Sequence, residues 1–448
     1  MADSKLYTKD SIESLSPLEF TRLRPGVYAG DTTYSTQLLV EIISNSVDEF
    51  RLGHGNQIDV TIDGPMVRVR DYGQGFLVNE MRDDGKTILE AAFSVLNTSG
   101  KYREDGTYEG TSLGSFGIGS KITTFLSHWL DVITIRDGKM EHVHFVEGEF
   151  EKRLTGKNDK PTGTIVEWVP SEEFFTHPEV EVEKVKSLFE TITCLCPGLT
   201  INLDDNGKKT TYHSTRGLND LADKMVKDKE IINNRFSMNF SEGKEKMDFI
   251  LTYTSNYSMT MVPYVNTGLT EKGPHITQIK TVLTRELNKF FKDKKWLKST
   301  DENLTGDDLQ EGMYIVFNIT APNVSYDAQV KSNITKIGMS TFTQALTENL
   351  SLWLANNEKE IKVIADKAIN AKKAREAAKK AREAARGDKK KKEKALKFDS
   401  KLADCYSKIR SNCEIYITEG DSASGNLKSA RNNEFQAVMP VRGKLRAQ

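Results

Sequence analysis

Residues 39–50, "LVEIISNSVDEF", place apolar residues at the three- and four-residue spacing that brings side chains to one side of a helix. These apolar residues are Leu39, Ile42, Ile43 and Val47. Glu41, Asn45 and Asp48 share a second, polar stripe. We therefore predict an amphipathic helix whose polar stripe is either a solvated surface or a wall that faces a bound ligand.

Alternating patterns predict strands elsewhere in the first half of the chain. Residues 57–71 alternate β-branched and polar residues on both sides of an Asp-Gly turn. Residues 129–146 repeat this pattern around a second Asp-Gly dipeptide, and residues 163–169, "GTIVEWV", have the pattern of a further strand. Helices and strands are thus mixed, which predicts an α+β fold.

The length of 448 residues exceeds what one hydrophobic core usually serves. We predict three domains, at residues 1–215, 216–400 and 401–448. No apolar run is long enough to span a bilayer and the N-terminus lacks the apolar core of a signal peptide, so we expect a cytoplasmic protein. The four cysteines lack C-x-x-C spacing, which favours reduced thiols over metal ligands.

The net charge of -1 conceals a basic segment. Residues 366–397 hold 14 Lys or Arg against 5 Asp or Glu, and "KKAREAA" occurs twice in succession within them. The seven-residue period predicts a long helix with an alanine seam, which we expect Gly387 and "DKKKKEK" to interrupt. Its basic surface is either a solvated face or a surface beside DNA phosphate.

Two glycine clusters follow the helix predicted at residues 39–50. Asp71 stands at a predicted strand end, in "DYGQG", where the backbone can approach a planar ligand closely. Residues 114–119, "GSFGIG", precede a predicted helix whose N-terminus could bind an anion. Each glycine cluster alone is weak evidence for a nucleotide site. Their order after the predicted helix with Glu41 and Asn45 is less likely to arise by chance.

In that order the motifs resemble the ATP-binding domain shared by gyrase B, the large chaperone ATPases, mismatch-repair ATPases and sensor histidine kinases. The resemblance implies a Bergerat-type (GHKL) ATPase sandwich. It implies that Glu41 orients and activates the attacking water, Asn45 binds the Mg²⁺ that accompanies ATP, and Asp71 accepts from the adenine amino group. The other nucleotide-binding residues that it implies are Asp48, Gly73, Gly75, Lys101, Tyr108, Gly114, Gly117, Ile118, Gly119 and Thr164.

Further stretches resemble type IIA DNA topoisomerases of the gyrase B or topoisomerase IV kind. "RLRPGVYAG" is similar to a segment near their N-terminus, with Tyr7 and Ile12 at the spacing of the arm that swaps between protomers. "LTGDDLQEGMYIVFNI" resembles part of their transducer, a domain with a mixed sheet and the long basic helix. Gln329 and Lys331 fit its Gln-x-Lys loop, so Lys331 is expected at the γ-phosphate.

The C-terminal stretches "YITEGDSASGN" and "PVRGK" resemble the opening of the Toprim cleavage domain, with Glu419 as a partial cleavage-site Mg²⁺ ligand. The resemblance implies double-stranded DNA and a homodimer formed on ATP binding as partners. It also implies missing partners: the Toprim remainder and a cleavage subunit with the active-site tyrosine. A truncated form and a split subunit, as in T-even-type phage topoisomerases, are the alternatives for the chain end, and we favour the second.

One departure from gyrase concerns Gln74, which stands where gyrase has Arg, so the ion pair with Glu49 is in question and Arg136 remains as a basic neighbour. Two other function classes stay open. A mismatch-repair-type ATPase would share the nucleotide motifs but leaves the Toprim-like stretch unexplained. A non-hydrolysing regulatory module would not need the Glu41 carboxylate.

Overall fold

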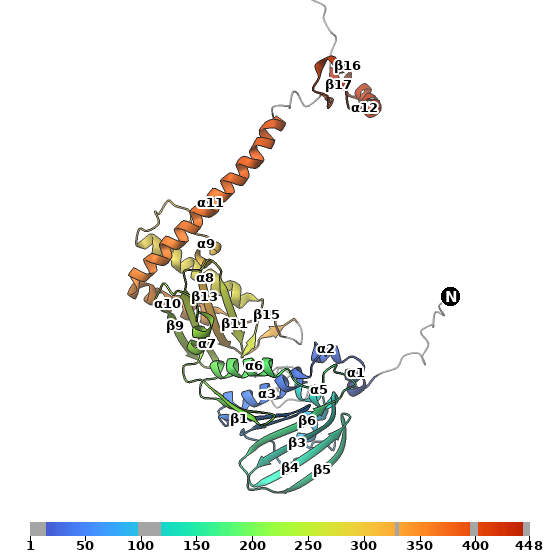
Figure 1. Cartoon of the computed structure of the whole chain (residues 1–448), viewed down its shortest axis with the longest axis vertical. Helices are drawn as coiled ribbons and strands as arrows, with labels where there is room; N and C mark the ends of the chain where they lie inside the picture. Colours follow the sequence, from blue (N-terminus) through green and yellow to red (C-terminus); the bar gives the residue numbers. More distant parts are fainter. Residues whose placement is uncertain (1–14, 97–117, 328–330, 395–401, 442–448) are drawn as a thin grey trace, which may run out of the picture. The chain divides into compact units, whose positions relative to one another are not determined.

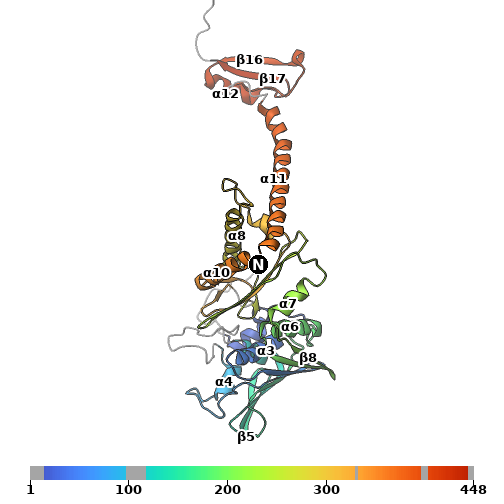
Figure 2. The same cartoon turned by 90° about the vertical axis from the view of Figure 1, so that its left-hand side faces the viewer.

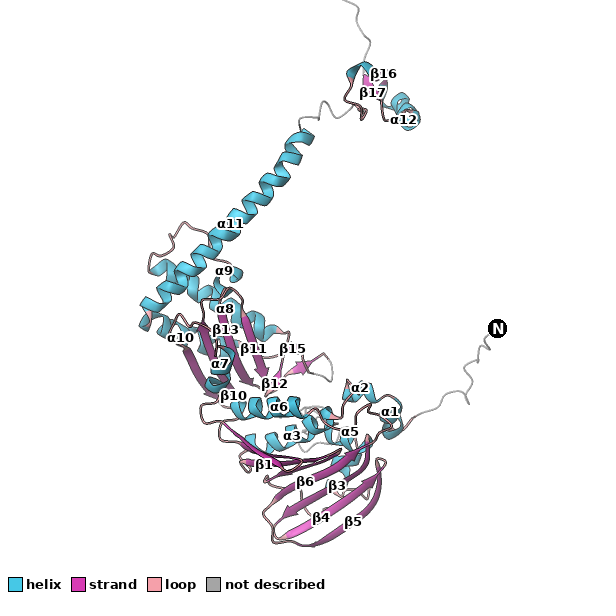
Figure 3. Ribbon diagram, in the orientation of Figure 1, coloured by secondary structure: helices cyan, strands magenta, loops and turns pink. Residues whose placement is uncertain are grey.

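The computed structural model describes residues 15–96, 118–327, 331–394 and 402–441. The chain divides into two compact units, residues 1–371 and 372–448. The first unit contains two mixed sheets with their helices (Figures 1 and 3). Among the described helices, none combines the length and the apolar character that crossing a bilayer requires.

The first sheet has eight strands in the order β5-β4-β3-β6-β2-β1-β7-β8. Neighbouring strands are antiparallel except β1 and β7, which are parallel. The strands are β1 Gln57–Asp63, β2 Met66–Asp71, β3 Ser127–Arg136, β4 Lys139–Val146, β5 Glu149–Lys157, β6 Gly163–Pro170, β7 Thr200–Asp205 and β8 Lys208–His213. Both predicted Asp-Gly hairpins are confirmed, with Asp63 opposite Met66 and Arg136 opposite Lys139.

Helices cover one face of this sheet, so the two layers form a sandwich (Figure 3). The helices of this region are α1 Pro17–Leu23, α2 Pro25–Ala29, α3 Thr36–Arg51, α4 Ile88–Ser94, α5 Gly119–Phe125 and α6 Val182–Leu195. The predicted amphipathic helix is α3, and its apolar stripe is almost completely buried against the sheet and α5. Burial of the opposite strand faces is only partial, as the alternation along β1 and β2 shows.

The second sheet has five strands in the order β12-β11-β13-β10-β9, with β11 and β13 parallel. Its strands are β9 Phe236–Glu242, β10 Glu245–Tyr253, β11 Thr260–Val265, β12 Gly268–Leu269 and β13 Met313–Thr320. The associated elements are α7 Leu218–Met225, α8 Pro274–Asp293, α9 Gly306–Gln310, β14 Ser325–Tyr326, β15 Ile334–Lys336 and α10 Ser340–Asn356. Helix α10 packs on β9 and α8, and Figure 2 shows α8 and α10 together beside the sheet.

The two sheets share buried side chains through α7. Leu218 and Ala222 of α7 belong to the same apolar core as Ile250, Tyr264 and Val316 of the second sheet. A polar contact joins the same two regions, because Nη2 of Arg51, at the end of α3, donates to Oγ1 of Thr320 at 3.0 Å. These contacts link the helix that carries the polar stripe to the second sheet.

Helix α11, Glu358–Lys394, confirms the predicted long helix but corrects the predicted interruption. It continues through Gly387 and into the lysine run. A single glycine costs a helix only about 1 kcal/mol, and the surrounding Ala, Lys, Arg and Glu residues all favour helix. The alanine seam of residues 374–384 is exposed.

The second unit contains a small βαβ element. β16, Glu414–Glu419, and β17, Gln436–Val441, pair in parallel, and α12, Gly420–Ala430, connects them. A short 3₁₀ turn, η2 Arg410–Asn412, precedes β16.

Candidate nucleotide site

The polar stripe of α3 has a graded exposure. Asp48 is buried, Glu41 is half-buried and Asn45 is exposed. Nε2 of Gln37, one turn before Glu41, donates to Oε1 of Glu41 at 2.9 Å. This bond fixes one carboxylate oxygen.

The start of α5 lies against the second carboxylate oxygen of Glu41. A Cβ atom on Gly119 would stand 2.1 Å from Oε2 of Glu41, so only glycine allows this approach. Ile118, the residue before the helix, is 9% exposed. One predicted site residue, Gly119, therefore lies against another, Glu41.

Asp71, at the end of β2, has its carboxylate held by backbone groups. Its Oδ1 accepts from the N–H of Gly73 at 2.9 Å and of Thr164 at 3.1 Å, and its Oδ2 lies 3.4 Å from the donating Oγ of Ser46. Burial raises the pKa of Asp71 to about 6, against these hydrogen bonds, and the nearby Glu49 carboxylate adds to the rise. The chain thus keeps this carboxyl group buried and hydrogen-bonded.

Thr164 reaches Asp71 because the preceding residue is a glycine. Gly163 has a φ of +146°, and a Cβ atom there would lie 2.2 Å from the carbonyl oxygen of Asp71. Strands β2 and β6 therefore converge at the Asp71 side chain.

The departure at Gln74 leaves Glu49 with a backbone partner. Oε2 of Glu49 accepts from the N–H of Gln74 at 3.1 Å. Nη1 of Arg136 donates to the carbonyl of Gly75 at 3.2 Å, so Arg136 is a basic neighbour of this glycine segment.

Lys331 lies just before β15, in the region of the second sheet, and interacts with residues of α3. The residue is only 9% exposed and its backbone has a φ of 59°. Burial lowers the pKa of Lys331, and the carboxylates of Glu41 and Asp48 oppose this change. An amino group and two carboxylates from distant parts of the sequence therefore share one electrostatic environment.

A cavity of about 570 Å³ lies beside Glu41 and Lys331. Its walls are α3, α6, residues 28–34 and residues 267–269, and both Glu41 and Lys331 line it. Asp71 does not line it, so the cavity is distinct from the Asp71 end of the site.

Several predicted residues lie outside the described residues: Tyr7, Ile12, Lys101, Tyr108, Gly114, Gly117 and Gln329. Glu419 is described; it ends β16, directly precedes α12 and is exposed. Sequence reasoning missed a cluster of Asp131, His142 and His144 on the first sheet. The alternating "HVH" of β4 opposite β3, with the register set by the Asp137-Gly138 turn, was the signal that could have revealed it.

Comparisons with known proteins place the chain in a family. The family model described as DNA gyrase B matches residues 217–384. The DNA gyrase B protein of Thermotoga maritima is 34% identical over 457 residues, covering 98% of this chain and 71% of the relative. The DNA topoisomerase IV B protein of Staphylococcus aureus is 34% identical over 454 residues, covering 98% and 68%.

Solved structures of gyrase B and topoisomerase IV ATPase domains have the same fold as this chain. The 43K ATPase domain of Thermus thermophilus gyrase B, in complex with an aminocoumarin, aligns with a TM-score of 0.66 and 27% identity over 82% of this chain and 97% of that chain. The topoisomerase IV ATP-binding domain of Francisella tularensis, in complex with a small-molecule inhibitor, has the same fold, with a TM-score of 0.67 at 24% identity over 80% and 97%.

These matches confirm the family and the GHKL ATPase fold predicted from the sequence, and they support the topoisomerase interpretation over the mismatch-repair alternative. The chain belongs to the gyrase B and topoisomerase IV B family, the ATPase subunits of ATP-dependent type IIA DNA topoisomerases.

Proposed function

We propose that ATP hydrolysis in this chain uses Glu41 as the base that orients and deprotonates the attacking water, with Lys331 as the cation at the γ-phosphate. The presence of both residues in the lining of one cavity, with an electrostatic interaction between them, carries the proposal. A half-buried carboxylate beside an ammonium group suits it, since the base must accept a proton while the cation balances phosphate charge. The Gln37 bond holds one oxygen of Glu41 and orients the other.

Asp71 is proposed to bind the adenine amino group. Its Oδ1 already accepts two backbone N–H groups, so Oδ2 is the oxygen left to accept a further donor. Thr164, Gly73 and Gly75 shape the same end of the site. The glycines at 73 and 75 let the Glu49 side chain and the carbonyl of Ile135 approach the backbone closely.

Asn45 is proposed to hold Mg²⁺ with the nucleotide. Its amide oxygen is exposed on α3, one turn after Glu41, and Mg²⁺ prefers oxygen ligands while keeping several waters. When bound, Mg²⁺ would neutralise charge on the phosphate oxygens. The chain's own contribution is to orient the amide on a rigid helix.

ATP binding is proposed to favour a closed homodimer that serves as a gate for DNA. Lys331 lies in the region of the second sheet and Glu41 on α3, so a γ-phosphate that contacts Lys331 would stabilise the closed arrangement of these two regions. The Arg51–Thr320 bond and the core shared through α7 give the two sheets a mechanical connection. The segments of residues 1–215 and 216–400 would then act as ATPase and transducer domains.

DNA is the proposed partner of the basic segment, residues 366–397, because 14 positive against 5 negative residues favour a polyanion. Strand cleavage is proposed to use Glu419 as one Mg²⁺ ligand, together with a partner subunit that carries the active-site tyrosine. A single carboxylate holds such a metal poorly, since cleavage sites use several.

Replacing Glu41 by Ala tests the central assignment. We expect turnover to fall by about 10²–10⁴-fold, the usual contribution of a general base, while ATP affinity changes only a few-fold. Phosphate release measures the first quantity and calorimetric titration of ATP the second. The matched control is Glu183→Ala on the exposed face of α6, which should keep normal turnover. Comparable turnover in Glu41→Ala would remove Glu41 from the chemistry.

A further inference from the structure

A cluster of metal-ligating side chains lies on the face of the first sheet opposite α3. In the β3–β4 pair, Asp131 stands opposite His144 and Ile133 opposite His142. The residues that alternate with them, Leu130, Val132 and Val143, belong to the core under the helices. Asp131, His142 and His144 therefore share the outer face, where their side chains are 16–25% exposed.

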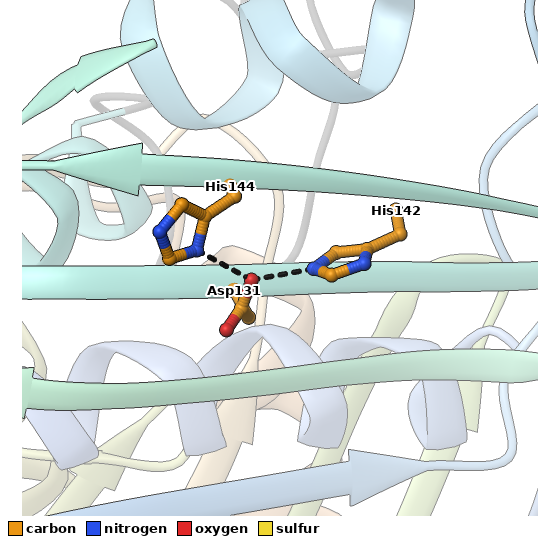
Figure 4. A group of neighbouring side chains, drawn as sticks. All are labelled: Asp131, His142 and His144. Atoms are coloured by element: carbon orange, nitrogen blue, oxygen red, sulfur yellow. Dashed lines mark hydrogen bonds and ion pairs between the residues drawn. The ribbon is translucent and has the colours of Figure 1, made fainter. Parts of the chain in front are cut away.

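One carboxylate oxygen is the meeting point of this cluster (Figure 4). Oδ1 of Asp131 lies 2.5 Å from Nε2 of His142 and 2.7 Å from Nδ1 of His144. The three possible ligand atoms all lie within 4.8 Å of one another.

The second nitrogen of His144 also faces a carboxylate. Its Nε2 lies 3.2 Å from Oε2 of Glu151 on β5. A neutral imidazole donates from only one nitrogen. If Nε2 donates to Glu151, the lone pair of Nδ1 points at the lone pairs of Asp131, and a proton or a metal cation must lie between them.

We propose that Asp131, His142 and His144 form a binding site for a divalent transition-metal ion of the Zn²⁺ class, with Glu151 as the positioning residue that orients His144. Two imidazole nitrogens and one carboxylate oxygen suit Zn²⁺, Co²⁺ or Ni²⁺ better than Mg²⁺ or Ca²⁺, which prefer oxygen ligands. A carboxylate on the far nitrogen of a ligating histidine is the usual arrangement around such metals.

Metal binding would lengthen the two contacts that Asp131 makes with the imidazoles. Bonds of about 2.0–2.1 Å in a tetrahedral site separate ligand atoms by about 3.3 Å, so each of these two contacts would lengthen by less than about 1 Å. Three protein ligands leave the fourth position to water on the exposed face. The ion would join β3 to β4 and stabilise the domain without taking part in ATP hydrolysis.

Metal binding to the untagged, chelator-treated chain tests the proposal. We expect competition with a chromogenic chelator to show Zn²⁺ binding that His144→Gln weakens at least 100-fold and Glu151→Gln about tenfold, as loss of an orienting partner does. Co²⁺ should give the visible absorption of a tetrahedral site in the wild type and lose it in His144→Gln. Zn²⁺ at about 100-fold above its dissociation constant should raise the Tm of the domain by roughly 5 °C.

Two controls make the result specific. His54 is an exposed histidine outside the cluster, so His54→Gln should bind Zn²⁺ normally. Cys405 and Cys413 have free thiols that could also take zinc, so the double variant Cys405→Ser/Cys413→Ser should retain the high-affinity site. Circular dichroism verifies that each variant is folded. Equal Zn²⁺ affinity in wild type and His144→Gln, loss of binding in the double cysteine variant, or no binding at about 100 µM Zn²⁺ would overturn the proposal.

Discussion

We expect Asp71→Asn to stabilise the fold at neutral pH while it weakens ATP binding. The asparagine side-chain oxygen can accept from the same two N–H groups, of Gly73 and Thr164, that now bond Oδ1 of Asp71. Its NH₂ group would replace Oδ2 and can donate to Oγ of Ser46. The substitution therefore removes a buried charge and keeps the local hydrogen bonds.

The pKa of Asp71 sets the size of the effect. Burial raises it from 3.8 to about 6, and this difference corresponds to about 3 kcal/mol of folding free energy at 1.36 kcal/mol per pH unit. The folded chain then holds its proton more tightly than the unfolded chain. Between about pH 4 and pH 6 the folded state carries more protons, so the free energy of unfolding falls as pH rises through this window and is level above it.

The gain in unfolding free energy from Asp71→Asn should depend on pH in the same window. It should be small near pH 4.5, grow towards pH 6 and reach about 1–3 kcal/mol at pH 7.5, because the amide also loses hydration when buried. Urea unfolding followed by tryptophan fluorescence, at several pH values, gives the difference between the two proteins. All other titrating groups cancel in that difference.

Asp63→Asn, at the exposed turn between β1 and β2, is the matched control and should show no pH-dependent difference of this size. ATP affinity of Asp71→Asn should fall at least about tenfold, because an NH₂ donor would face the adenine amino donor. A stability difference that does not change between pH 4.5 and 8, or a less stable variant at pH 8, would refute the reasoning from burial.

Three further predictions concern the proposed phosphate end of the site. Lys331→Ala should make ATP and ADP produce more similar oligomeric states, because the lost cation no longer stabilises the closed dimer with ATP bound. Light scattering with a non-hydrolysable ATP analogue measures the oligomeric state, and the exposed Lys336→Ala is the control. Unchanged dimerisation in Lys331→Ala would contradict the prediction. Gly119→Ala should lower turnover at least about tenfold, because its Cβ would stand 2.1 Å from Oε2 of Glu41 and displace the carboxylate; phosphate release with unaltered rates would show that the carboxylate position is not critical. Asn45→Ala should raise the Mg²⁺ concentration that half-maximal ATPase activity needs, and an unshifted Mg²⁺ titration would exclude Asn45 as a ligand.

Short sequence patterns predicted the hairpins and helices whose formation depends on neighbouring residues. The two Asp-Gly turns gave both hairpins because the flanking alternation and the turn specify the register together. The spacing along residues 39–50 predicted α3 because its apolar stripe had to be buried. The Asp71 end of the site followed from motif order and resemblance, since nothing local indicates that Thr164, far along the chain, donates to the same carboxylate.

Predictions were weakest where a local preference competed with its surroundings or where contacts were distant in sequence. Gly387 was expected to stop the basic helix, but its modest cost was smaller than the helix preference of its neighbours. The Glu49 partner could not be deduced from side chains, because the partner is the backbone N–H of Gln74. The Asp131 cluster needed the β3–β4 register to be converted into side-chain positions.

Helix α3 joins the proposed catalytic residue Glu41 to a contact with the second sheet. Glu41 lies near its start, where it shares an electrostatic environment with Lys331 from the second-sheet side. Arg51 lies at its end, bonded to Thr320 on β13. A rigid helix of 16 residues transmits a displacement from one end to the other. We propose that closure of Lys331 on the γ-phosphate would act on the second sheet through two routes, its own segment and α3.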